Sequence, residues 1–149
     1  MSLEAKLMTD LKAAMKSKDQ AATRTIRAVK AAILLVKTDG TGKELDATGE
    51  IKLIQKLMKQ RQDSLDIYNK QNRADLAVIE EEEIAVLQRY LPKQMSAEEL
   101  ETLLKGIISQ TGASSMKDMG KVMGLASAKI AGAADGKTVS AAVKKLLMG

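Results

Sequence analysis

The triplet Gly136-Lys137-Thr138 is the first place where residue types and spacing match a known chemistry, because it has the form of the end of a phosphate-binding loop. That loop needs a glycine five residues before Gly136, and Ala131 stands there. No strand-like pattern precedes the triplet, so a loop could not start from the edge of a sheet. The sequence therefore predicts a turn in which Thr138 caps a helix.

Four consecutive glutamates, Glu80 to Glu83, are a second candidate, since carboxylates are the ligands that hard cations prefer. Consecutive helical residues fan out around the axis and do not converge on one ion, so the run is typical of a solvated helix face. The chain has no histidine and no cysteine. Imidazole bases, thiolate nucleophiles and cysteine or histidine zinc sites are thereby excluded. We predict no catalytic residue, no metal site and no cofactor, and hence a protein that acts by binding.

A third group combines two lysines with two glycines. Lys117 and Lys121 are spaced one helical turn apart, and Gly120 and Gly124 follow on an adjoining strip. Each glycine inside a helix costs about 1 kcal/mol relative to alanine. Either close helix packing or the close approach of a partner's backbone has to offset that cost, and the physical argument alone favours packing.

Basic residues also form two other rows at helical spacing, Arg24-Arg27-Lys30 and Lys52-Lys56-Lys59. Such rows are usually plain solvent-exposed surface. The whole chain has 24 basic and 19 acidic residues, for a net charge of +5, and residues 93–149 have eight basic against five acidic residues. This balance permits a polyanionic partner without requiring one.

The elements that position these residues are predicted to be helices, because apolar residues recur at helical spacing nearly everywhere. A first helix begins after Ser2, a second follows a break at residues 17–19, and a loop covers residues 38–43. The third and fourth helices cover about residues 49–70 and 73–90, and three shorter ones begin near residues 96, 115 and 138. Only Tyr68 and Tyr90 are aromatic, so we expect an aliphatic core whose gaps are filled by the nine methionines.

Pro92, the only proline, ends the fourth helix because its ring blocks helix continuation. The predicted fold is all-α, with an N-terminal four-helix lobe over residues 1–92 and a smaller three-helix C-terminal lobe over residues 93–149. No apolar run reaches the length of a membrane span, and the first residues do not have the pattern of a signal peptide. We expect a cytoplasmic protein with no membrane partner.

Segments in both lobes resemble the GatB/YqeY family, in family order along the chain. The strongest likeness is in residues 113–124 and 134–140, with further likeness in residues 59–64, 72–76 and 90–96. One position departs from the family pattern, because Ala133 stands where many members have a basic residue. The large catalytic part of GatB has no counterpart, so the resemblance implies a free-standing YqeY-like protein.

The resemblance implies two helical lobes and a link to tRNA. In GatB, the similar domain is a tail of the tRNA-dependent amidotransferase, where it helps to hold the tRNA while another region transfers ammonia. Free-standing members inherit from this kinship the label of a carbon–nitrogen ligase with glutamine as amido donor. That label reflects kinship, since no residue here could activate a carboxylate or hydrolyse glutamine.

The leading functional prediction is an accessory protein that binds tRNA or another structured RNA through the C-terminal lobe. Phosphate contacts are expected from Lys117, Lys121, Lys129 and Lys137, with Gly120 and Gly124 permitting close approach. The alternative is a protein-interaction adaptor in which Met119 and Met123 form a groove for a partner helix. A third possibility, an amidotransferase, requires a partner that carries the chemistry.

Overall fold

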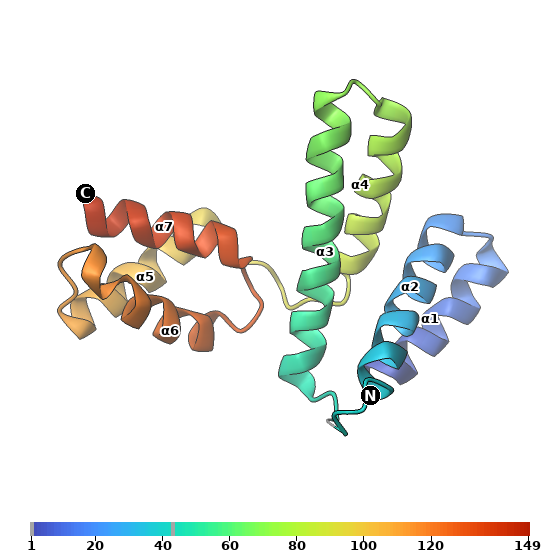
Figure 1. Cartoon of the computed structure of the whole chain (residues 1–149), viewed down its shortest axis with the longest axis horizontal. Coiled ribbons are helices and arrows are strands. Elements are labelled where there is room, and N and C mark those ends of the chain that lie inside the picture. Colours follow the sequence, from blue (N-terminus) through green and yellow to red (C-terminus); the bar gives the residue numbers. More distant parts are fainter. Residues whose placement is uncertain (1, 43) are drawn as a thin grey trace. The chain divides into compact units, whose positions relative to one another are not determined.

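The computed structural model describes residues 2–42 and 44–149, and this part of the chain is helical with no strand (Figure 1). The helices are α1 (Leu3–Ser17), α2 (Gln20–Lys37), α3 (Ala47–Lys70), α4 (Ala74–Gln88), α5 (Ala97–Thr111), the 3₁₀ turn η1 (Met116–Asp118), α6 (Met119–Ile130) and α7 (Gly136–Met148). The prediction of an all-helical fold is confirmed. The loop expected over residues 38–43 ends at Lys43, which lies outside the described residues. No described helix is both long and apolar enough to cross a membrane.

Side-chain caps fix where most helices begin. The hydroxyls of Ser2 and Ser96 accept hydrogen bonds from backbone N–H groups three residues later, as predicted. The prediction for the last helix was wrong, because Asp135 caps it and α7 begins at Gly136. The hydroxyl group of Thr138 instead donates a hydrogen bond to Asp135 Oδ2 at 2.9 Å, because an ionised carboxylate can only accept hydrogen bonds.

Two further boundaries differ from the sequence prediction for local reasons. The third helix begins at Ala47, because Asp46 Oδ1 accepts the N–H of Gly49 at 2.7 Å and so caps the helix earlier. The helix expected from Ser115 starts as a 3₁₀ turn, and regular α-helix begins only at Met119. Lys117 therefore lies in the turn that leads into α6.

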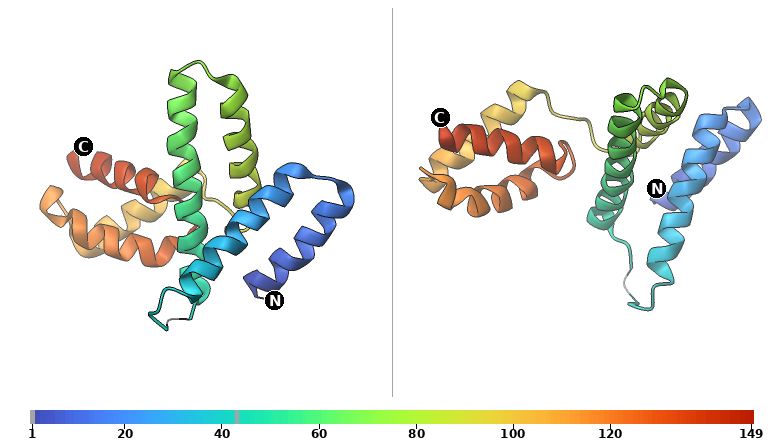
Figure 2. Two further views of the ribbon diagram at one scale, coloured as in Figure 1. Left: turned by 45° about the vertical axis from the view of Figure 1, so that its right-hand side comes forward. Right: turned by 45° about the horizontal axis from the view of Figure 1, so that its top comes forward.

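The chain divides into two compact units, residues 1–91 and 92–149, each with its own core. In the N-terminal unit, α1 lies beside α2, α3 lies beside α4, and α2 also packs against α4 (Figures 1 and 2). In the C-terminal unit, α5, α6 and α7 pack against one another. Both cores are aliphatic, as expected from a sequence with two aromatic residues.

The methionines only partly fill the role predicted for them. Met58, Met95, Met119 and Met123 are partly buried and pack against the two cores. Four others are exposed: Met8, Met15, Met116 and Met148. Leucine, isoleucine and valine already supply the fully buried positions, so much of the thioether surface is left in solvent.

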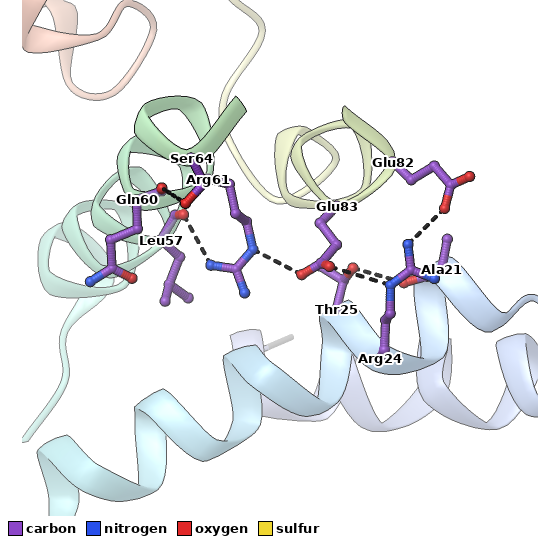
Figure 3. Close-up of polar contacts among 9 residues, drawn as sticks. All are labelled: Ala21, Arg24, Thr25, Leu57, Gln60, Arg61, Ser64, Glu82 and Glu83. Atoms are coloured by element: carbon purple, nitrogen blue, oxygen red, sulfur yellow. Dashed lines mark hydrogen bonds and ion pairs between the residues drawn. The ribbon is translucent and has the colours of Figure 1, made fainter. Parts of the chain in front are cut away.

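A row of ionic hydrogen bonds joins α2, α3 and α4 across the N-terminal unit (Figure 3). Glu83 on α4 accepts from Arg61 Nε on α3 at 3.0 Å and from Arg24 Nε on α2 at 3.3 Å. Arg24 Nη2 also donates to Glu82 at 2.6 Å. The side chains of Glu83 and Arg61 are only 15% and 16% exposed. The prediction of a solvated glutamate face was therefore wrong for Glu83, because successive helical residues fan out and this one faces the neighbouring helices.

Burial also affects Glu80 in the same helix. Desolvation raises the pKa of its carboxyl group above the usual range, and the nearby negative charge of Glu83 raises it further. Among the described residues, no group of three carboxylates is arranged to hold a metal ion.

Tyr90 connects the end of this unit to α1. Its hydroxyl donates to Asp10 Oδ2 at 2.5 Å, and Lys6 Nζ lies 5.2 Å from the ring centroid. The ring is partly buried against the core. Burial, followed by the hydrogen bond to Asp10, raises the pKa of the Tyr90 hydroxyl above its usual range.

Replacing Tyr90 with phenylalanine is expected to lower the free energy of unfolding by roughly 1.5 kcal/mol, because Asp10 loses a charge-assisted hydrogen bond. The native state holds the phenolic proton more tightly than the unfolded chain. Stability is therefore retained below the ordinary tyrosine pKa of about 10 and is lost as pH rises above it. Urea unfolding at neutral and alkaline pH measures both effects. An unchanged alkaline loss in the phenylalanine variant would contradict this assignment.

Candidate nucleic-acid interface in the C-terminal unit

Four of the residues selected from the sequence share one exposed face at the start of α6. Lys117 lies in η1, Lys121 lies in the first turns of α6, and Gly120 and Gly124 lie on the same helix. All four are exposed, whereas the opposite face of α6 buries Val122, Ala126 and Ile130 in the core. The 3.6-residue period of α6 brings Gly120, Lys121 and Gly124 to the solvent side together, and Lys117 precedes them in the 3₁₀ turn.

The two glycines are not explained by packing inside the chain. A Cβ atom added at Gly120 or Gly124 would meet no heavy atom within 4 Å beyond the neighbouring backbone of its own helix. The preference for close helix packing was therefore wrong for the described residues. The alternative explanation, that the glycines leave room for a partner, remains a prediction.

The other two predicted contact residues lie elsewhere on the unit. Lys129 is exposed in the last turn of α6, eight residues after Lys121, which places it about 80° further around the helix. Lys137 is exposed in the first turn of α7, which packs against α6. The structure thus groups Lys117 with Lys121 and leaves Lys129 and Lys137 at separate positions.

Charge in this part of the unit is strongly unbalanced. Residues 113–149 contain six lysines and two acidic residues, Asp118 and Asp135. Both carboxylates face local backbone: Asp118 accepts from the N–H groups of Ser114 and Ser115, and Asp135 accepts from that of Thr138. Within the described residues none of the six lysines forms an ion pair within 4.0 Å, whereas Lys105 on α5 pairs with Glu101.

The loop between α6 and α7 is held by contacts that sequence reasoning did not find. Gln94 Nε2 donates to the carbonyl oxygen of Gly132 at 3.0 Å, and the N–H of Met95 donates to that of Ala133 at 2.8 Å. Every residue has a backbone carbonyl group, so the sequence cannot indicate which carbonyl oxygens accept these hydrogen bonds. Ala133, where the family pattern often has a basic residue, packs against the core of this unit.

Met119 and Met123, the residues proposed for a partner groove, also pack against the core. Besides Leu125, which is 43% exposed, the described surface of α6 presents lysine side chains and small residues to a partner. Such a surface suits an extended anion, because ammonium groups bind phosphate as point charges and glycines let a backbone come close.

The fold and this face together define a class: an all-helical protein of two small units, with exposed lysines and no nearby carboxylate partner on the C-terminal unit. A family model described as Yqey-like protein matches residues 4–147. The chain belongs to the YqeY-like family, as its resemblance indicated.

Three relatives share the name "Altered inheritance of mitochondria protein 41, mitochondrial". The protein of Lachancea thermotolerans is 40% identical over 97 residues, which cover 65% of this chain and 52% of the relative. The protein of Meyerozyma guilliermondii is 36% identical over 125 residues, which cover 80% of this chain and 64% of the relative. The protein of Pyrenophora tritici-repentis is 30% identical over 146 residues, which cover 95% of this chain and 79% of the relative. The chain thus spans about half of the first relative and less than two thirds of the second.

The names of these relatives contradict the expected cytoplasmic location, because they are mitochondrial proteins by name. That expectation rested on the lack of an apolar run of membrane length and of a signal-peptide pattern. These two features bear on membrane insertion and secretion, so they do not distinguish the cytoplasm from a mitochondrial compartment.

Proposed function

We propose that the C-terminal unit binds structured RNA, with tRNA as the first ligand to consider, through the exposed face that carries Lys117 and Lys121. In this proposal the chain carries out no reaction of its own. It holds RNA by contacts with the phosphate backbone, in keeping with the resemblance to the GatB tail domain.

One observation carries the proposal: residues 113–149 have six lysines without ion pairs among the described residues, and two of them, Lys117 and Lys121, lie near two glycines that leave the surface of α6 open. Lysines that already had carboxylate partners would give up those ion pairs on binding RNA. Here the cations remain available for phosphate, and binding releases the counterions condensed on the RNA. The open glycine strip allows a phosphate backbone to approach α6 more closely than side chains would permit.

The residue types also favour recognition of RNA shape over recognition of bases. Both aromatic residues, Tyr68 and Tyr90, belong to the N-terminal unit, so the C-terminal unit has no ring on which a base could stack. Lysines on a helix surface contact phosphates without reading sequence. Double-helical and folded RNA are recognised mostly in this way.

Replacing both Lys117 and Lys121 with alanine is expected to weaken tRNA binding about tenfold at moderate salt. The slope of log affinity against log salt concentration should also fall by about 2, one unit for each lost phosphate contact. Fluorescence anisotropy of labelled tRNA at several salt concentrations measures both quantities. Because the relatives are named as mitochondrial proteins, mitochondrial tRNA is included in the test.

A matched control comes from α3, where Lys52 and Lys56 have the same spacing and are also exposed. The Lys52→Ala, Lys56→Ala variant has the same net charge as the test variant and should keep nearly the full affinity. An equal loss in both variants would mean that overall charge is responsible, and the proposed face would be rejected.

Replacing Gly124 with glutamine should have opposite effects on the stability of α6 and on the affinity for tRNA. Open space surrounds this position, so Gly124→Gln should stabilise the helix by roughly 0.5 kcal/mol through its better helix propensity. The same side chain stands where the phosphate backbone should approach, and tRNA affinity should fall. A more stable variant with unchanged affinity would show that close approach plays no part in binding.

A further inference from the structure

A hollow of about 450 Å³ lies where α1 ends and α2 begins, on the N-terminal unit. Its lining residues are Met15, Lys18, Gln20, Thr23, Arg24 and Arg27. Four of them follow one another at helical spacing along the first half of α2, and the other two come from the end of α1. The lining thus contains three cations and no carboxylate.

Two of these three cations have no ionic partner in the described part of the chain. Arg24 is held by Glu82 and Glu83 on α4 through Nη2 and Nε. Arg27 instead directs Nη2 to the sulfur of Met15 at 4.0 Å, and neither Arg27 nor Lys18 has a carboxylate within 4.0 Å among the described residues. The hollow therefore has a net positive charge, with Arg24 fixed in place by α4.

The backbone conformation at Lys18 fixes where this side chain leaves the turn between α1 and α2. Lys18 has φ of 61° and ψ of 31°, the left-handed conformation in which glycine is usually found. The N–H of the next residue, Asp19, donates to Ala14 O at 2.9 Å and closes the turn. A lysine at this position is less favourable for the backbone than glycine, and it places an ammonium group at the rim of the hollow.

We propose that this hollow binds the phosphate groups of a phosphorylated small molecule. Guanidinium and ammonium groups together are the donors typical of phosphate sites, and the planar fork of Arg27 suits two phosphate oxygens. The hollow is open to solvent, so it leaves room for a ligand larger than one inorganic phosphate. Met15 and the arginine stems provide apolar surface for the organic part of the ligand.

The test is a titration of the full-length, isotope-labelled protein with adenosine triphosphate, followed by NMR. The shifts should move mainly at residues 15–27, and adenosine without phosphate should move none of them. Arg27→Gln and Lys18→Gly should each weaken the binding about tenfold, because each removes one charge from the lining. Lys30→Gln and Lys16→Gln, which remove charges on the same helices outside the lining, should bind normally.

Lys18→Gly also shows whether a loss of binding is caused by a loss of folding. Glycine adopts the observed backbone conformation without strain, so this variant should unfold at a temperature no lower than the unmodified protein. Loss of binding with an intact fold supports the proposal. Shifts spread over all basic surfaces, or normal binding by Lys18→Gly and Arg27→Gln, would overturn it.

A second arm distinguishes a phosphorylated small molecule from the backbone of RNA as the source of phosphate. If tRNA moves the same signals and adenosine triphosphate does not, the site serves polynucleotides, and a small-molecule ligand is excluded. The Lys117→Ala, Lys121→Ala variant should still bind adenosine triphosphate at the hollow. This inference therefore stands or fails separately from the proposal for the C-terminal unit.

Discussion

Replacing Glu83 with glutamine is expected to lower the free energy of unfolding by roughly 3 kcal/mol, near the lower end of what breaking a buried ion pair costs. The carboxylate of Glu83 accepts from Arg61 and Arg24 at 3.0 and 3.3 Å, so one anion compensates cations from two helices (Figure 3). Glutamine has nearly the same size but no charge. Arg61, which is only 16% exposed, would be left in a largely buried position without its counter-ion.

The substitution should affect Arg24 less than Arg61, because Arg24 keeps an ionic hydrogen bond to Glu82 at 2.6 Å. The cost should therefore come mainly from the contact between α3 and α4. Circular dichroism during urea unfolding measures it. Glu81→Gln is the matched control, since Glu81 lies two residues earlier on the same helix and is exposed; its effect should stay within about 0.5 kcal/mol. Equal effects of the two substitutions would contradict a structural role for Glu83.

Replacing Leu104 with alanine is expected to destabilise the C-terminal unit by roughly 3 kcal/mol or more. Leu104 on α5 is fully buried and belongs to the core cluster of that unit. The substitution removes buried methyl groups and leaves a cavity that three short helices can only partly close. Small units bury a lower fraction of their surface and have a small free energy of unfolding. The substitution would therefore remove a large part of the unit's stability.

Leu125→Ala is the matched control for this substitution, because Leu125 on α6 is 43% exposed. Its effect should be below about 1 kcal/mol, since little apolar surface is lost from the core. A Leu104 variant as stable as the control would show that the core of the unit is not organised around this residue. If RNA binding needs the folded unit, the Leu104 variant should also lose affinity in proportion to its unfolded fraction.

The helices could be predicted because their signals are local. Apolar spacing and the caps Ser2 and Ser96 each act within a few residues of their own positions. The end predicted for the fourth helix from Pro92 was less accurate, because α4 ends at Gln88 and not at residue 90. Boundaries shifted where several candidate caps lie close together, as at Asp135 and Thr138. A carboxylate accepts hydrogen bonds more strongly than a hydroxyl, and here it fixed the first turn of α7.

The role of Glu83 could not be predicted, because it depends on which neighbours a helix meets. Glu80 to Glu83 are four identical residues in sequence, and only the packing of α4 against α2 and α3 distinguishes one from the next. The same reason explains the error at Gly120 and Gly124. A glycine pair suits helix packing only when a second helix lies across it, and the sequence of α6 does not reveal that its neighbours lie on the other face.

The positions of the tyrosines make the two units distinguishable by spectroscopy. Tyr68 and Tyr90 both lie in residues 1–91, and the chain has no tryptophan or phenylalanine. Intrinsic fluorescence therefore comes only from the N-terminal unit, whereas the helical signal of circular dichroism comes from both units. Subtracting the fluorescence curve, weighted by the N-terminal unit's share of the helical signal, from the circular dichroism curve yields the unfolding of the C-terminal unit, with no added label and no truncation of the chain.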